Sequence, residues 1–182
     1  IAFTDDDCQP EPDWLGHARP YFDDAGVVGV EGLVVSGPVN DPRYRAVTNL
    51  GFQGIGFMTA NLLLRRDTFN ALDGFDEQFD VPFREDTDLG WRACALGRIP
   101  FGHDVRVFHP PHPRSLEREA QSTRVRFFEK DALLLKKHPD RYKSLFLMEG
   151  HYRDTAGFRE HFMRGSVKYG VPIDEFYAAR LI

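Results

Sequence analysis

Three consecutive carboxylates, Asp5, Asp6 and Asp7, directly follow an apolar, strand-like stretch at residues 1–4. Like charges this close together repel one another unless a cation or a hydrogen-bond network intervenes. In open α/β sheets, ligands bind beyond the carboxyl ends of strands. A strand that delivers Asp5 and Asp7 to that edge therefore favours a site for Mg²⁺ or Mn²⁺. A solvated acidic turn is the alternative interpretation.

The composition is that of a globular protein. The chain has 182 residues, of which 42% are hydrophobic and 28% are charged, enough to bury a core and to carry a helical appendage. The formal net charge of -5 provides no broad cationic field of the kind that drives nucleic-acid binding. We therefore expect no nucleic-acid partner.

The two cysteines, Cys8 and Cys94, lie far apart without metal-ligand spacing, which favours neither a zinc site nor a disulfide framework. This usage fits a reducing compartment. The sequence offers no apolar run long enough to span a bilayer. We expect a cytoplasmic protein. Peripheral attachment at the inner face of the membrane is the alternative.

Hydrophobic patterning predicts an α/β fold. The pattern predicts strands at 27–36, 57–64, 98–100 and 105–108, a helix beginning at Trp14, a second helix capped by Asp67, and a third over 85–96 that ends before Gly97. Residues 37–56 are expected to form a long functional or mobile loop. A long amphipathic helix is predicted over 116–138.

Further candidates for chemistry lie at Glu85, Asp86 and His109. The two acids open a predicted helix, where the helix dipole favours their ionised forms. Together with Asp5 and Asp7 they make four carboxylates, and such a group would suit a cation or a catalytic task. Acids in the first turn of a helix also serve simply as capping residues. His109 follows a predicted strand. It is a candidate metal ligand, and a surface histidine in a proline-rich turn is the alternative.

Four sequence blocks together resemble the second half of a family 2 glycosyltransferase. The blocks are TDDDCQPEPDWL at 4–15, ANLLLRRDTFNALDGFDEQF at 60–79, REDTDLGWR at 84–92 and VFHP at 107–110, and they occur in the family's order. The resemblance covers residues 1–112 as the second half of a GT-A catalytic region. It implies a GT-A-like mixed sheet flanked by helices and truncated at the N-terminus, with 113–182 as a helical C-terminal extension.

The resemblance also implies residue roles. Asp5-Asp6-Asp7 matches the DXD motif, in which Asp5 contacts the nucleotide and Asp7 binds the metal that bridges the two phosphates. Glu85-Asp86 matches the ED motif, whose Asp86 is the general base, and His109 matches a further metal ligand. The implied substrate-binding residues are Asp5, Asp6, Glu85 and Arg92. Imidazole beside carboxylates suits Mn²⁺ somewhat better than Mg²⁺.

The expected function is a metal-dependent, inverting transfer of sugar from a nucleoside-diphosphate sugar to a hydroxyl acceptor, which is a glycan, a lipid-linked acceptor or a small molecule. A divalent cation stabilises the charged leaving group, and a carboxylate takes the proton of the acceptor hydroxyl. Two alternatives stay open. One is a non-catalytic remnant that binds carbohydrate or a partner. The other is a nucleotidyltransferase, which gives Glu85 and Asp86 no role.

The family's first βαβα unit, which carries base- and ribose-binding residues, has no counterpart in this chain. The strand that begins at Ile1 is therefore expected to lack neighbours. Such a strand leaves backbone groups without partners or a sheet edge open to pairing with another copy. We expect an incomplete donor site and self-association through the open edge.

Overall fold

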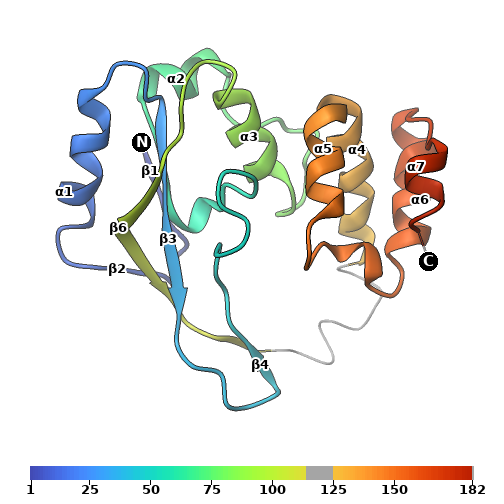
Figure 1. Cartoon of the computed structure of the whole chain (residues 1–182), viewed down its shortest axis with the longest axis horizontal. Helices are drawn as coiled ribbons and strands as arrows, with labels where there is room; N and C mark the ends of the chain where they lie inside the picture. Colours follow the sequence, from blue (N-terminus) through green and yellow to red (C-terminus); the bar gives the residue numbers. More distant parts are fainter. Residues whose placement is uncertain (114–124, 182) are drawn as a thin grey trace. The chain divides into compact units, whose positions relative to one another are not determined.

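The computed structural model describes residues 1–113 and 125–181, so part of the helix predicted over 116–138 lies outside the described residues. The chain divides into two compact units. The first, the sheet unit, comprises Ile1–Gln78 and Glu85–Arg114. The second, the helical unit, comprises Phe79–Arg84 and Ser115–Ile182. Figure 1 shows the strands in the first unit and the helices α4 to α7 in the second.

A five-stranded mixed sheet organises the first unit, in the order β1-β5-β3-β6-β2. The central strands β3 and β6 are parallel, and the other neighbours are antiparallel. The α/β fold predicted from the sequence is confirmed. The strands are β1 (Ala2–Phe3), β2 (Gln9–Pro10), β3 (Gly29–Ser36), β5 (Leu62–Leu64) and β6 (Phe101–His109), and a separate ribbon pairs β4 (Tyr44–Arg45) with β7 (His112–Pro113).

Both faces of β3 are covered. Neighbouring strand residues point to opposite faces of a sheet, and in β3 the neighbours Val30 and Glu31 are both buried. Val30 packs with Ala18 of α1 (Trp14–Ala18), Leu63 and Val105 in a buried apolar cluster. The adjacent Glu31 is fully buried on the opposite face. Figure 1 shows α1 and α3 (Glu85–Ala93) on the two sides of the sheet.

Two of the predicted strands differ from the structure. The strand predicted at 98–100 does not form: Arg98 makes only an isolated bridge with Val27, and β6 begins at Phe101. The strand predicted at 105–108 lies within the longer β6, which runs to His109 with a register shift against β3 between Gly32 and Leu33. At that shift, Asn61 Nδ2 donates to the carbonyl oxygens of Leu33 and Val105 at 3.0 and 2.8 Å. The two carbonyl groups at the shift are thus hydrogen-bonded by a side chain in place of a backbone partner.

The strand predicted at 57–64 is correspondingly shorter. Residues Thr59–Asn61 form the 3-10 helix η2, and only Leu62–Leu64 pair in the sheet. The next helix, α2 (Arg66–Ala71), begins after Arg65, with no side-chain cap. Asp67 was expected to cap that helix but lies inside its first turn, where its charge still suits the helix dipole.

Helix α3 is held by residues 55–57 of the preceding loop. Thr87 Oγ1 donates to the Gly56 carbonyl oxygen at 3.0 Å, and Trp91 Nε1 donates to the Ile55 carbonyl oxygen at 3.0 Å. A Cβ atom on Gly90 would lie 2.3 Å from the Phe57 ring, so the helix approaches that ring as closely as glycine permits. The helix ends at Ala93, earlier than the predicted end at residue 96.

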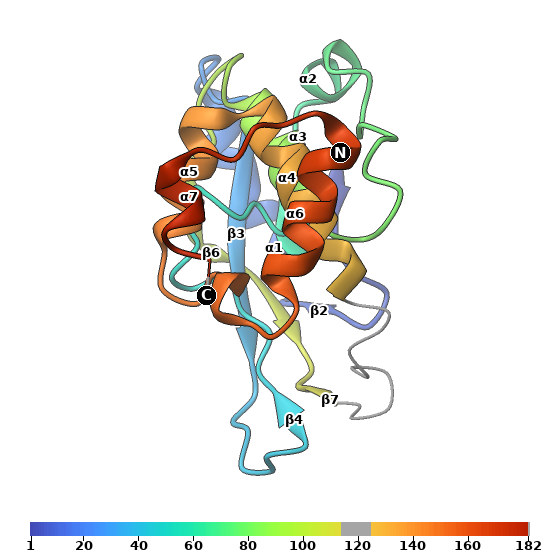
Figure 2. The ribbon, with the colours of Figure 1, turned by 90° about the vertical axis from the view of Figure 1, so that its right-hand side faces the viewer.

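The helical unit has an aromatic core. Four of its aromatic side chains are fully buried, namely Tyr142, Phe146, Phe158 and Phe162. Its helices α4 and α6 approach closely, since a Cβ on Gly165 would lie 2.5 Å from the Glu129 carbonyl oxygen. The elements, visible in Figure 2, are η3 (Val125–Phe128), α4 (Glu129–Lys137), α5 (Pro139–Leu147), η4 (Tyr152–Asp154), α6 (Phe158–Tyr169) and α7 (Glu175–Ala178).

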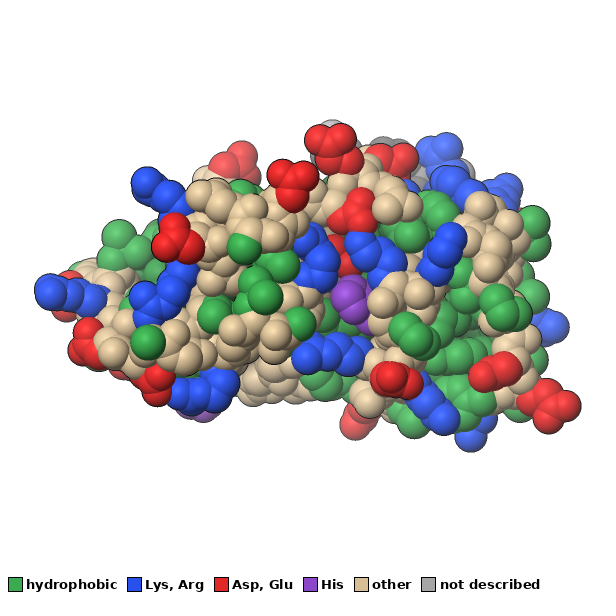
Figure 3. Space-filling model, turned by 90° about the horizontal axis from the view of Figure 1, so that it is seen from above, with side chains coloured by type: hydrophobic (Ala, Val, Ile, Leu, Met, Phe, Trp, Pro, Cys, Tyr) green, Lys and Arg blue, Asp and Glu red, His purple; other side chains and the backbone are tan. Residues whose placement is uncertain are grey.

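Surface charge is mixed. On the face drawn in Figure 3, acidic and basic side chains are interspersed, in keeping with the small net negative charge. Within the described ranges, none of the helices combines the length and apolar character that crossing a membrane requires.

Candidate metal centre

The strongest candidate site lies where two strands of the sheet end. Strand β1 ends at Phe3 and delivers a turn in which the Cys8 backbone N–H donates to the Asp5 carbonyl oxygen at 3.1 Å. Strand β6 ends at His109. Ligand atoms of Asp5, Asp7, Cys8 and His109 all lie within 4.8 Å of one another. The predicted convergence of Asp5, Asp7 and His109 is therefore present in the structure, whereas Asp6 is not a member of this group.

The orientation of His109 follows from its neighbours. Its Nδ1 lies 2.8 Å from the Pro110 carbonyl oxygen, which can only accept, so Nδ1 donates to it. The other ring nitrogen, Nε2, faces Asp5 Oδ2 at 3.8 Å and Asp7 Oδ1 at 3.7 Å. Both distances are longer than hydrogen bonds.

The charges of this group act on one another. Burial raises the pKa of Asp5, and the charges of Asp7 and Asp6 add to the rise, whereas His109 acts in the opposite direction. Burial is also the largest cause of the raised pKa of the Cys8 thiol, to which the charges of Asp5 and Asp7 contribute. A cation at this position would offset the repulsion among the acids, because an opposite charge favours the ionised form.

The donor set fits a divalent cation. Two carboxylates and an imidazole nitrogen suit Mn²⁺, and the carboxylates alone suit Mg²⁺. The side chain of His109 is 6% exposed, and those of Asp5 and Asp7 are 45% and 47% exposed. The group is therefore fixed on the His109 side and open to solvent on the carboxylate side, as binding of an external ligand requires.

Cys8 is a member of the group that the sequence did not indicate. A cysteine without a second cysteine or histidine at ligand spacing gives no metal signal, and its partner His109 lies far along the chain. The signal that could have pointed to it is its position directly after the three acids. Its thiol adds a soft ligand to a set of hard ones.

The two acids of the ED pair lie at the start of α3, as predicted. Asp86 Oδ1 accepts from the Thr87 backbone N–H at 2.6 Å, which fixes the carboxylate at the positive end of the helix dipole. Asp86 is partly exposed, so an external hydroxyl can approach it. Glu85 and Asp86 are not members of the metal-ligand group.

Arg92, a predicted substrate-binding residue, is engaged within the protein. Its Nε donates to Asp88 Oδ2 at 2.7 Å, and its two terminal nitrogens each donate to a backbone carbonyl oxygen, those of Leu72 and Gly74, at 2.9 Å. The two carbonyl contacts tie the last turn of α3 to the turn after α2, and the pair with Asp88 lies within the helix. Substrate binding by Arg92 stays a prediction.

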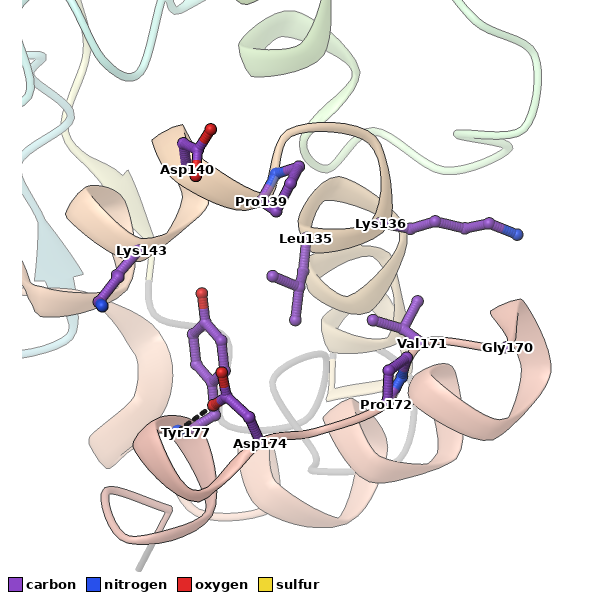
Figure 4. A pocket seen from close by; sticks show the side chains of 10 residues that line it. All are labelled: Leu135, Lys136, Pro139, Asp140, Lys143, Gly170, Val171, Pro172, Asp174 and Tyr177. Atoms are coloured by element: carbon purple, nitrogen blue, oxygen red, sulfur yellow. Dashed lines mark hydrogen bonds between the residues drawn. The ribbon is translucent and has the colours of Figure 1, made fainter.

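A separate pocket lies in the helical unit, with a volume of about 420 Å³. Figure 4 shows Tyr177 and Leu135 at this pocket, with Asp174 accepting from the Tyr177 backbone N–H at 3.2 Å. Its two lysines already have partners, because Lys136 donates to the Tyr169 carbonyl oxygen and Lys143 lies 4.4 Å from the Phe176 ring centre. The pocket therefore lacks the converging polar groups of the metal-ligand group.

No family model matches this chain, and neither a curated protein nor a solved structure does. The function must therefore be argued from the chemistry of the residues that the fold brings together.

Proposed function

We propose that this chain carries the metal-binding and acceptor-activating parts of an inverting glycosyltransferase of GT-A type that uses a nucleoside-diphosphate sugar. The observation that carries the proposal is the convergence of Asp5, Asp7 and His109 Nε2 at the ends of β1 and β6. Two carboxylates and an imidazole nitrogen that face one another beyond hydrogen-bond distance are a donor set that suits a divalent cation. A sugar diphosphate is a donor whose leaving group needs that cation.

The sequence blocks named above supply the second support. In the proposal, Asp7 and His109 hold Mn²⁺ or Mg²⁺, and Asp5 and Asp6 contact the nucleotide side of the donor. When bound, the cation stabilises the negative charge that develops on the departing diphosphate. Cys8 Sγ lies within the same group and is available as a further ligand.

Asp86 is the proposed general base. It accepts the proton of the acceptor hydroxyl while that oxygen forms a bond to the anomeric carbon and the bond from that carbon to the diphosphate breaks. Displacement from the side opposite the diphosphate inverts the anomeric configuration. Glu85, the preceding acid at the start of α3, is assigned to the acceptor side.

Titration calorimetry with Mn²⁺, alone and then with UDP or GDP, tests the donor half of the proposal. Wild type is expected to bind Mn²⁺ and to bind one of the diphosphates only when Mn²⁺ is present. Asp7→Ala and His109→Ala are expected to lose most of the Mn²⁺ affinity, because each removes a ligand. Asp23→Ala, which removes an exposed acid of the same unit, is the matched control and should bind as wild type does.

Equal Mn²⁺ affinity for wild type and Asp7→Ala would remove Asp7 from the site. The transfer itself is tested with a panel of nucleoside-diphosphate sugars, by following release of the nucleoside diphosphate in the presence of Mn²⁺. Metal binding with no diphosphate binding and no release would favour the carbohydrate- or partner-binding alternative.

A further inference from the structure

Glu31 is a buried carboxyl group that the proposed reaction does not use. It lies in the central strand β3, between its pairing partners Leu62 and Phe101, and has no exposed surface. A buried acid is costly unless hydrogen bonds or a partner charge compensate it. Its contacts therefore indicate what it does.

The side-chain hydrogen bonds of Glu31 lead to residues 49–57, which we call the 49–57 loop. Its Oε2 accepts from the Gly54 backbone N–H at 2.7 Å, and its Oε1 accepts from Asn49 Nδ2 at 3.3 Å. Asn49 is itself fully buried, and its side chain also bonds to Gly32 and Val34 of β3. The carboxyl group of Glu31 thus fastens the middle of the loop to the sheet.

The same loop holds helix α3. Thr87 and Trp91 donate to the Gly56 and Ile55 carbonyl oxygens, and Gly90 lies against the ring of Phe57. Phe57 keeps a left-handed backbone with φ of 54°, a conformation that persists only where its surroundings impose it. A continuous series of contacts therefore leads from Glu31 through the loop to the helix that begins with Glu85 and Asp86.

The ionisation of Glu31 is coupled to this arrangement. Burial raises the pKa of Glu31 to about 7 against the hydrogen bonds from Gly54 and Asn49, and the negative charge of Asp86 contributes to the rise. The loop itself has no titratable side chain, and neither does β5. On β6, His103 and Asp104 are exposed, Arg106 is partly exposed, and His109 is buried at the end of the strand. Helix α3 also carries Glu85, Asp88 and Arg92, and Arg92 pairs with Asp88 at 2.7 Å.

We infer that Glu31 is a positioning residue for Asp86: its buried carboxyl fastens the 49–57 loop to β3, and the loop holds the first turns of α3. The hydrogen bonds from Gly54 and Asn49 favour the ionised carboxylate, but its complete burial disfavours that form more strongly, so ionisation of Glu31 loosens the connection as the pH rises. The inference rests on the proposed function where it concerns Asp86 as the base. The loosening of the loop is a physical property that stands without it.

Hydrogen exchange at the two tryptophan indoles, followed by NMR, measures the loosening directly. Trp91 Nε1 bonds to Ile55 in the loop, whereas Trp14 Nε1 bonds to Asn61 outside it at 2.9 Å. The ratio of the two exchange rates cancels the intrinsic pH dependence of indole exchange. Between pH 5 and pH 8, the ratio of the Trp91 rate to the Trp14 rate is expected to rise about 10- to 100-fold in wild type, since opening restores an ordinary carboxyl group.

Glu31→Gln is the decisive variant, because it keeps the shape of the protonated side chain and cannot ionise. Its exchange ratio should stay flat over this pH range. Glu77→Gln, which changes an exposed glutamate of the same unit, should rise as wild type does. A flat ratio in wild type, or an unchanged rise in Glu31→Gln, overturns the inference. If Glu31→Gln does not fold, the wild-type result alone decides.

Turnover gives the second readout. In wild type, kcat should fall above neutral pH as α3 loosens, and Glu31→Gln should remove that fall while KM for the donor stays the same. An unchanged kcat profile in Glu31→Gln overturns the link to Asp86. Complete absence of transferase activity, together with the expected exchange result, contradicts the proposed function and leaves the loop mechanism intact.

Discussion

Arg84 donates from Nε to Asp131 Oδ1 at 3.1 Å inside the helical unit, although the next residue along the chain begins α3 of the sheet unit. The Tyr142 hydroxyl donates to the same oxygen at 3.1 Å. Asp131 is fully buried and Arg84 has a left-handed backbone with φ of 74°. Although burial acts in the opposite direction, the charge of Arg84 and a hydrogen bond from His151 lower the pKa of Asp131.

Arg84→Ala is therefore expected to destabilise the helical unit by about 3–5 kcal/mol, because it leaves a buried carboxylate without its countercharge. Urea unfolding followed by circular dichroism measures the change. Arg43→Ala, which removes the exposed Arg43–Asp41 pair, is the control and should unfold at the wild-type urea concentration. A loss for Arg84→Ala no larger than for this control would show that the buried pair contributes little.

Acidification is expected to affect the two units in opposite directions. Burial lowers the pKa of His151 from its ordinary value of 6.5, so the unfolded chain binds a proton there before the folded chain does. The helical unit should lose stability as the pH falls below 6.5. Glu31, whose pKa is raised from 4.5 to about 7, binds its proton first in the folded chain. The sheet unit should gain stability as the pH falls from 7 to 4.5.

Backbone hydrogen exchange at pH 7.5 and pH 5, corrected for intrinsic rates, checks this for α4 and β3 in one sample. Protection should fall in α4 and rise in β3. His151→Gln should abolish the first change and leave the second. Parallel changes in both elements would contradict the assignment of the two groups.

Cys8 is expected to set the metal preference of the candidate centre. Cys8→Ser should change Mn²⁺ binding little, because Asp5, Asp7 and His109 stay in place, but should weaken Cd²⁺ binding strongly, since Cd²⁺ prefers thiolate. The thiolate-to-Cd²⁺ absorption band in the ultraviolet reports the contact. Cys94→Ser, in the same unit and outside the group, should retain the band. Its persistence in Cys8→Ser would exclude the Cys8 thiolate as a ligand.

Strand β1 was expected to lack neighbours, but it pairs with β5 on one side. It lies at the edge of the sheet, where pairing with another copy is expected. Ile1 exchanges two hydrogen bonds with Leu64, so the backbone groups of Ala2 point to the free edge in the alternating antiparallel pattern. Light scattering should show concentration-dependent association. Ala2→Pro removes a donor from that edge without touching the β5 ladder and should shift the protein towards the monomer. A wild-type monomer at every concentration would contradict edge pairing.

The sequence predicted features that depend on local chemistry. The Val-rich run gave β3, and the acids Glu85 and Asp86 correctly marked the start of α3. It misjudged features that depend on distant partners. Asn61 satisfies carbonyl groups of two strands, so residues 59–61 curl into η2 where the apolar pattern favoured a strand. Residues 79–84 join the helical unit because the partner of Arg84 is Asp131.

The site shows the same division. Asp5, Asp7 and His109 were predictable because carboxylates and imidazole at strand ends are a recognised donor set. The buried position of Glu31 could not be predicted, because a single glutamate in a Val-rich strand is typical of a strand with one solvated face. Only the fold shows that the loop and α3 cover that second face.

The last prediction concerns Asp86, the proposed base. Asp86→Asn keeps the size of the side chain and an oxygen that can accept from the Thr87 N–H but cannot take a proton from the acceptor, so kcat should fall by about 10²–10⁴-fold. Binding of the nucleoside diphosphate with Mn²⁺ should be unchanged. Asp7→Asn should instead weaken Mn²⁺-dependent diphosphate binding together with turnover. Steady-state kinetics and calorimetry on the two variants separate these roles. A loss of kcat below tenfold in Asp86→Asn would exclude this residue as the base, and with it the proposed mechanism of acceptor activation.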